Sequence, residues 1–206
     1  MIVIQPSYFG PISQFAVMSK YAEVGLEVCD NYQKQTYRNR CYIYGANGKL
    51  MLNIPIIHQK DGYRQLTKNI KIEPAFNWKT QHLKSIQTAY QTSPFFEFYE
   101  DDFLAFFEKD YTHLLDVNIS GIKLISDLLG LEITFSETSA YKPVIELKKD
   151  YRFLANAKTE QPFTFETYTQ MFDDKYGYIP NLSILDLLFM EGPNALNYLE
   201  NQVTEI

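Results

Sequence analysis

The densest group of side chains that could do chemistry lies in residues 30–41, whose sequence is DNYQKQTYRNRC. Arg38 and Arg40 are two residues apart, and in a β-strand such residues share one face. Two guanidinium groups on one face suit a phosphate, pyrophosphate or carboxylate, because each presents a fork of N–H donors. The structural alternative is a solvated edge strand with surface salt bridges, which on residue types alone is the commoner arrangement.

Other polar residues lie near the ends of two expected strands. The amides of Gln5 and Gln33 and the phenol of Tyr8 could bind sugar hydroxyls or an amide there. Polar residues at strand ends are common in any fold, so this pattern has a structural interpretation too. Asp30 could act as a general base or accept a bond from a ribose hydroxyl, although such an aspartate more often caps a turn.

His82 lies on an otherwise apolar face of an expected helix that includes Trp78 and Ile86. A buried neutral imidazole with one hydrogen bond is the commoner reason for such a residue. An imidazole titrates near neutral pH, however, and can therefore transfer protons during catalysis. We predict His82 and Asp30 as the residues for proton transfer, and we expect the His82 face to point toward the ends of the first two strands.

The composition excludes several classes of function. The net charge of −6 argues against a nucleic-acid binder, which needs a positive surface to displace counterions. Cys29 and Cys41 form no disulfide framework or zinc-ligand spacing, and no cofactor or metal motif occurs. The start MIVIQPSYFG does not resemble a signal peptide, and no apolar run reaches membrane-spanning length. We therefore expect a cytoplasmic protein that takes a small-molecule substrate and holds no metal or cofactor.

Residues 1–30 show the pattern of a strand, a helix and a second strand. An apolar run over residues 1–4 ends at Gln5-Pro6. Pro11 suits the first turn of a helix, and a second apolar run covers residues 24–29. This order predicts two parallel strands joined by a right-handed crossover. The loop over residues 5–11 would then lie at the edge where open α/β sheets bind ligands.

The rest of the chain predicts a hairpin and then mostly helices. CYIY and LMLNI flank GANGK, in which Asn47-Gly48 favours a tight turn. Short strands are expected at 70–72 and 131–135, loops or irregular structure at 58–69 and 136–165, and helices at 77–93, 95–109, 112–129, 184–191 and 195–202. Ser183 and Asp186 resemble a capping box. The expected fold is α/β in a single domain over residues 1–206: a mostly parallel sheet begun by a β-α-β unit, with an antiparallel hairpin and a helical C-terminal half.

Five motifs occur in order along the chain. They are QPSYFGP, DNYQKQ, YRNRCYIYGANGKL, a Trp-x-x-x-His pair followed by AYQTSPFFEFYEDD, and PNLSILDLLFMEGP. Each motif is short, but the five together are specific. The chain resembles the WbqC-like protein family from Ile2 to about Leu199.

This resemblance implies a role in bacterial surface polysaccharide, because the family is associated with surface-polysaccharide and O-antigen loci. It implies a transferase that acts on a sugar or sugar nucleotide and moves an amino acid such as glycine onto an amino sugar. Many members have a histidine directly before the Gln-Pro pair, where this chain has Ile4, and this departure gives His82 more weight. The residues at matching motif positions are Gln5, Pro6, Tyr8, Asp30, Gln33, Arg38, Asn39, Arg40, Trp78, His82, Tyr90, Pro94, Ser183 and Asp186.

The resulting prediction is a transferase of surface-glycan precursor synthesis, which moves an acyl or aminoacyl group onto an amino sugar or sugar nucleotide. Arg38 and Arg40 would line an anion site for a phosphorylated sugar, and His82 or Asp30 would deprotonate the acceptor amine. The residues expected to position the sugar are Gln5, Tyr8, Gln33 and Asn39. The alternative is a non-catalytic sugar-nucleotide-binding or scaffold protein of the same pathway, which a site without a poised base would favour.

Overall fold

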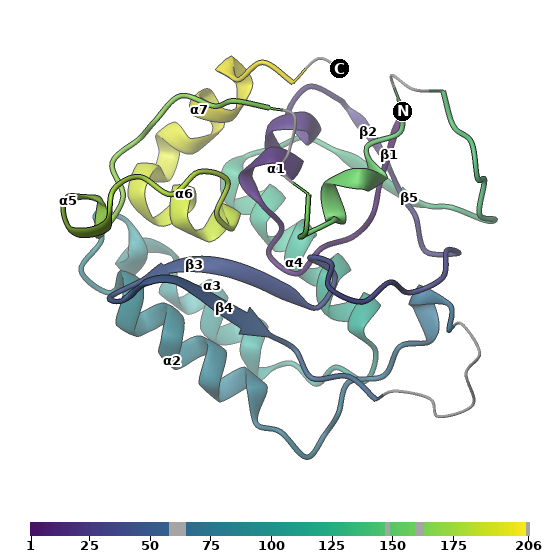
Figure 1. Ribbon diagram of the computed structural model, residues 1–206, viewed down its shortest axis with the longest axis horizontal. Helices are drawn as coiled ribbons and strands as arrows, with labels where there is room; N and C mark the ends of the chain where they lie inside the picture. The colour runs from purple at the N-terminus through teal and green to yellow at the C-terminus, as the bar shows by residue number, and fades with distance from the viewer. Residues whose placement is uncertain (58–64, 147–148, 160–162, 205–206) are drawn as a thin grey trace.

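The computed structural model describes residues 1–57, 65–146, 149–159 and 163–204 (Figure 1). Within these residues the fold is mixed α/β, with a three-stranded parallel sheet, a two-stranded antiparallel hairpin and several helices. The predicted fold class is therefore confirmed. Most of the loop predicted at 58–69 lies outside the described residues. Among the helices of the described chain, none has the length and apolar character needed to cross a membrane.

β1 (Ile2–Ile4), α1 (Ile12–Met18) and β2 (Glu23–Leu26) form the predicted crossover unit. β1 and β2 pair in parallel, with Val3 opposite Gly25, which confirms the prediction for residues 1–30. Every residue of β1 and α1 is buried, as is typical of a parallel strand and of the helix that covers it. The loop over residues 5–11 therefore leaves the sheet at its carboxyl edge.

The third strand of the sheet, β5 (Thr134–Glu137), pairs in parallel with β2. The strand predicted at 131–135 exists, but it begins later than expected. Gly130 ends α4 (Leu114–Leu129) in the left-handed conformation, with a φ of 73°, so residues 131–133 are used to return the chain to the sheet. Residues 136–165, predicted to be irregular, contain the short helix η3 (Arg152–Ala155).

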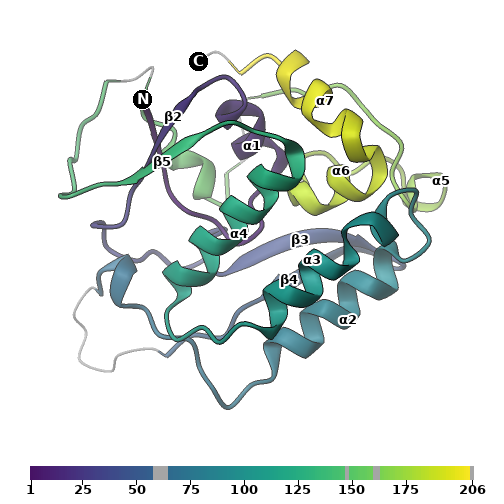
Figure 2. The ribbon, with the colours of Figure 1, turned by 180° about the vertical axis from the view of Figure 1, so that it is seen from behind.

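β3 (Arg40–Gly45) and β4 (Gly48–Asn53) form the predicted hairpin. Gly48 has a φ of 95°, which a residue with a Cβ rarely adopts, whereas Asn47 is not in the positive-φ region. β3 of the hairpin packs against α2 (Trp78–Tyr90), and α2 in turn packs against α3 (Phe96–Glu108) (Figures 1 and 2). Asn77 caps α2 as predicted, because its side chain accepts the N–H of Thr80.

Phenylalanine side chains join the sheet region to the helices. Phe9, from the loop after β1, packs against Phe106 of α3 with ring centroids 5.0 Å apart. Phe103 of α3 contacts Phe189 of α6 (Ile184–Glu191) at 5.2 Å. Because aromatic side chains bury large apolar areas, these contacts fix the loop after β1 against the helical core.

The strand predicted at 70–72 is wrong. η1 (Thr67–Asn69) precedes this segment, and residues 71 and 72 form only isolated bridges with His113 and Ile56. Ile70 and Ile72 are buried while Lys71 is exposed. The alternating pattern therefore reflects the packing of a connecting segment, which has no neighbouring strand to extend.

The helix α6 begins where predicted. Ser183 is its N-cap, and the Ser183 hydroxyl accepts the N–H of Leu185 at 3.3 Å and donates to the carbonyl of Phe9 at 2.7 Å. This pair of bonds ties the start of α6 to the loop after β1. The remaining helical elements of the C-terminal half are α5 (Asp173–Tyr176), η4 (Gly192–Asn194) and α7 (Ala195–Asn201).

Asp186 does not complete the predicted capping box. Its carboxylate is fully buried and accepts hydrogen bonds from Tyr90 at 2.7 Å, Tyr168 at 2.5 Å and Gln170 at 3.0 Å. Burial raises the pKa of Asp186, and these hydrogen bonds oppose that rise. The carboxylate thus joins α6, α2 and the segment before α5.

We predict that Asp186→Asn lowers the free energy of unfolding by about 1–3 kcal/mol, the usual cost of unsatisfied buried polar groups. The N–H of Tyr44 donates to the Tyr90 hydroxyl at 3.0 Å, so Tyr90 must direct its own proton to residue 186. An asparagine has one acceptor oxygen, and its amino group would face the amide of Gln170. Urea unfolding measures the change, with Asp102→Asn at an exposed position of α3 as the control. Equal stability of the two variants would contradict the prediction.

Candidate functional site

A cavity of about 530 Å³ lies at the carboxyl ends of β1 and β2. Open α/β sheets bind ligands at this edge, and the volume lies within the range of about 300–1,000 Å³ that is usual for small-molecule sites. The lining residues come from the segments after β1 and β2 and from residues 141–156. They are Gln5, Asp30, Asn31, Gln33, Thr36, Tyr141, Ile145, Asp150, Arg152, Phe153 and Asn156.

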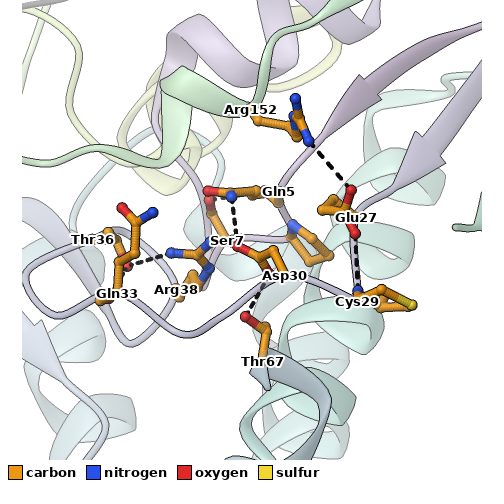
Figure 3. Close-up of polar contacts among 12 residues, drawn as sticks. Gln5, Ser7, Glu27, Cys29, Asp30, Gln33, Thr36, Arg38, Thr67 and Arg152 are labelled. Atoms are coloured by element: carbon orange, nitrogen blue, oxygen red, sulfur yellow. Dashed lines mark hydrogen bonds and ion pairs between the residues drawn. The ribbon is translucent and has the colours of Figure 1, made fainter. Parts of the chain in front are cut away.

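Asp30 lies between three hydrogen-bond donors (Figure 3). Gln5 donates to Oδ2 at 2.8 Å, Arg38 donates to the same oxygen, and Thr67 donates to Oδ1 at 2.6 Å. The side chain of Asp30 is only 4% exposed. Burial raises the pKa of its carboxyl, while the charge of Arg38 and the Thr67 hydrogen bond oppose that rise. A carboxyl group with a raised pKa at a cavity is a candidate for proton transfer.

The lining residues between 141 and 156 form one wall of the cavity, and Arg152 fixes this wall in place. Its guanidinium forms a bidentate pair with Asp150 at 2.8 and 2.6 Å and donates to the carbonyl of Lys142 at 2.8 Å. It also lies 3.5 Å from Oε2 of Glu27, a buried residue that follows β2. Because all three nitrogens of Arg152 already have acceptors, this side chain fixes the wall rather than offering an unpaired cation to a ligand.

Carboxylates outnumber guanidinium groups in the two ion-pair groups at the cavity. Asp30, Glu27 and Asp150 pair with two cations, Arg38 and Arg152. Burial raises the pKa of Asp150, but the hydrogen bonds and charge of Arg152 outweigh burial and leave that pKa below its ordinary value. The remaining negative charge suits a ligand with a cationic or hydrogen-bond-donating group.

Aromatic side chains give the same cavity an apolar side. Tyr141 and Phe153 line it and are 49% and 39% exposed. The amides of Gln5, Asn31 and Gln33 are also part of the lining. An aromatic ring can pack on the C–H face of a sugar ring while amides bind its hydroxyls. The cavity therefore suits a ring with one apolar face and several polar substituents.

The loop that carries Gln5 is strained and held at several points. Phe9 has a φ of 38°, which is uncommon for a residue with a side chain. The N–H of Tyr8 donates to the carbonyl of Tyr37, and the N–H of Ile184 donates to the carbonyl of Gly10, both at 2.9 Å. These contacts place the start of the loop beside Asp30, where Gln5 makes its hydrogen bond.

A comparison with known families matches the region of the chain that forms the whole cavity lining. The model of the WbqC-like protein family matches residues 5–161, which are 157 of the 206 residues. The chain belongs to the WbqC-like protein family. The matched region contains every residue that lines the cavity, whereas the motif PNLSILDLLFMEGP lies beyond it. Searches of curated proteins and of solved structures gave no match.

In this WbqC-like protein, three of the predicted site residues line one cavity. Gln5 and Asp30 are hydrogen-bonded to each other, and Gln33 lies on the same lining. They come together because the segments after two neighbouring parallel strands meet at one sheet edge. Their roles in binding and proton transfer stay predictions.

The structure does not place Arg38 and Arg40 on one strand face. β3 begins only at Arg40, so the spacing rule for strands does not apply to Arg38. Arg38 is fully buried and paired with Asp30, and neither arginine lines the cavity. Arg38 therefore neutralises Asp30, and the two arginines do not form the expected open anion site.

Tyr8 and Asn39, predicted to position a sugar, lie in the interior away from the cavity lining. Tyr8 is fully buried, and its hydroxyl lies 2.9 Å from Nδ1 of His82. The amide of Asn39 donates to Oδ1 of Asn53 at 3.0 Å and thereby joins the start of the hairpin to its end. Both residues are occupied by structural contacts.

His82 is also away from the cavity. Its side chain is 5% exposed and packs against Trp78 of the same helix and against Tyr8. Burial lowers the pKa of His82 to about 4, although a hydrogen bond with the Asn53 backbone opposes the change. The expected approach of His82 to Gln5 and Asp30 is not observed, so we assign it no proton transfer.

Sequence reasoning missed Thr67, Glu27, Asp150 and Arg152. Thr67 is 37 residues from Asp30, and Arg152 is 125 residues from Glu27. No local periodicity reports contacts over such separations. The only signal was the spacing of Asp150 and Arg152, two opposite charges two residues apart in an otherwise irregular segment.

We predict that His82 makes the protein less stable on acidification. The pKa of a histidine in an unfolded chain is about 6.5, and in this fold it is about 4. Between these values the unfolded chain binds more protons than the folded one. The stabilisation is therefore complete above about pH 6.5 and is lost as the pH falls toward 4, by on the order of 3 kcal/mol.

Urea unfolding at about pH 7.5 and about pH 4.5 measures this dependence. His82→Gln should be less stable than the unaltered protein at the higher pH, because packing is lost, but should lose less stability on acidification. His113→Gln, at a side chain that is 36% exposed, is the matched control and should keep the original dependence. If His82→Gln also keeps it, the assignment of this pH effect to His82 is wrong.

Proposed function

We propose that this protein is a transferase of surface-glycan precursor synthesis, which moves an acyl or aminoacyl group, such as glycyl, onto an amino sugar or sugar nucleotide. The observation that carries the proposal is one cavity with a buried carboxyl, several amides and two exposed aromatic rings. Membership of the WbqC-like family supports the pathway, because the resemblance to this family implies a role in bacterial surface polysaccharide.

The lining suggests how an amino sugar would bind. Its apolar ring face would pack against Tyr141 or Phe153, and its hydroxyls would meet the amides of Gln5 and Gln33. The amino group would approach Asp30, because the excess of carboxylates favours a cationic or donating group there. This orientation uses each kind of side chain that the cavity offers.

Asp30 would then act as the general base of the transfer. The ammonium group of the bound sugar first gives one proton to Asp30, and the neutral nitrogen then attacks the carbonyl carbon of an activated acyl donor, such as a thioester, so that a C–N bond forms as the C–S bond breaks. The nitrogen loses its second proton to solvent, and Asp30 passes its own proton to the thiolate leaving group. The raised pKa of Asp30 improves its capacity to accept this proton.

A non-catalytic binding protein of the same pathway is the second candidate. It is favoured by the position of His82, which leaves Asp30 as the single predicted proton acceptor at the cavity. The guanidinium groups of Arg38 and Arg152 are both paired with carboxylates, so neither is an unpaired cation for an anionic leaving group. The two candidates differ in whether bound sugar is modified.

We predict that Asp30→Asn lowers the rate of transfer by about 10²–10⁴-fold, the usual contribution of a positioned base. Glucosamine and a glycyl thioester are the probes, and mass spectrometry detects the N-glycyl product. Asp110→Asn, at a fully exposed position, is the control and should keep the original rate.

Calorimetry with glucosamine and with N-acetylglucosamine separates the two candidates. Glucosamine should bind more tightly, because only its amine can carry a positive charge toward Asp30. Binding without product in the unaltered protein would favour the binding-protein function. If neither sugar binds, or if Asp30→Asn transfers at the original rate, the proposed site is wrong.

A further inference from the structure

The carboxylate of Asp30 has one position without a donor among the described residues. A carboxylate offers about four lone-pair positions, two on each oxygen. Gln5 and Arg38 both donate to Oδ2 and fill its positions. Thr67 fills one position on Oδ1, at 2.6 Å, and no other described residue donates to that oxygen. The remaining position on Oδ1 is thus the one without a donor from the described residues, and Asp30 lines the cavity.

Thr67 holds Asp30 by its backbone and by its side chain. The N–H of Thr67 donates to the carbonyl of Asp30 at 2.8 Å, while the hydroxyl donates to the carboxylate. Thr67 belongs to η1 and is 2% exposed, so water has little access to replace its hydroxyl. The two contacts restrict both the backbone of Asp30 and the rotation of its carboxylate.

We propose that Thr67 is a positioning residue, which orients Asp30 so that the open position of Oδ1 meets the bound ligand. Thr67 does not line the cavity, so it acts through Asp30. The inference rests on the proposed function where it treats that position as the proton acceptor. The orientation itself is a property of the ligand-free protein and can be measured without any transfer reaction.

The other charged groups near Asp30 act through different atoms. Arg38 approaches Oδ2 from the segment before β3, and Glu27 repels the carboxylate from the end of β2. Asp150 and Arg152, which belong to the cavity wall formed between residues 141 and 156, are paired with each other. A change at Thr67 therefore alters the environment of Oδ1 and leaves these four charges in place.

The test is a carbon-13 NMR titration of the Asp30 carboxyl in the full chain, with labelled aspartate and no ligand. Asp30→Asn identifies the signal. Thr67→Val keeps the side-chain shape but loses the hydroxyl, so the midpoint should rise by about one pH unit or more, because the ionised carboxylate loses a donor. Thr67→Ser restores the hydroxyl and should return the midpoint to its original value. Ser19→Ala removes another hydroxyl, which donates to the Ala16 carbonyl and contacts neither Asp30 nor Arg38, and should move the midpoint much less.

An unchanged midpoint in Thr67→Val, or an equal rise in Thr67→Ser, overturns the proposal. Should Thr67→Val fail to fold, hydrogen exchange of the Thr67 hydroxyl in the unaltered protein decides. Slow exchange supports a buried bond to the carboxylate, and exchange as fast as in an exposed threonine overturns it. A raised midpoint together with no transfer in the unaltered protein refutes the proposed function alone.

Discussion

The buried ion pair between Asp30 and Arg38 is the constraint on which the cavity depends. Arg38 is fully buried and the Asp30 side chain is 4% exposed, so both charges have lost most of their water. Removing an ion from water costs several kcal/mol, and its partner offsets this only when further hydrogen bonds satisfy the remaining polar atoms. Gln5 and Thr67 supply such bonds to Asp30. The segments that carry these residues therefore have to meet at one place.

The same pair organises the backbone around it. Asn118 of α4 donates one amide to two carbonyls, that of Pro6 at 3.2 Å and that of Arg38 at 2.8 Å. The loop after β1 and the segment before β3 are thereby fixed on one helix. Asp30 follows β2, and Thr67 brings η1 to the other side of the carboxylate. Four segments of the chain thus share one polar centre, and the cavity lies beside it.

Local sequence patterns predicted many of the helices and strands around the cavity, because buried residues recur at regular intervals along a strand or a helix. The β1–α1–β2 unit, the hairpin and α2 were readable for that reason, and Gln5, Asp30 and Gln33 followed from the ends of the strands. The site itself depends on contacts that no local pattern records, such as Arg152 with Glu27. His82 shows the limit of residue type: its helix face predicted burial correctly, but burial brought it to Tyr8 and not to the cavity.

Two buried carboxylates in this fold show what separates a candidate functional position from a structural one. Asp30 and Asp186 each accept three hydrogen bonds, and burial raises the pKa of both. The donors to Asp186 are two phenols and an amide, and its side chain is fully enclosed. Asp30 has a cation as one of its partners and lines a cavity. A raised pKa therefore marks both residues alike, and the cavity beside Asp30 is what makes it, and not Asp186, the candidate for proton transfer.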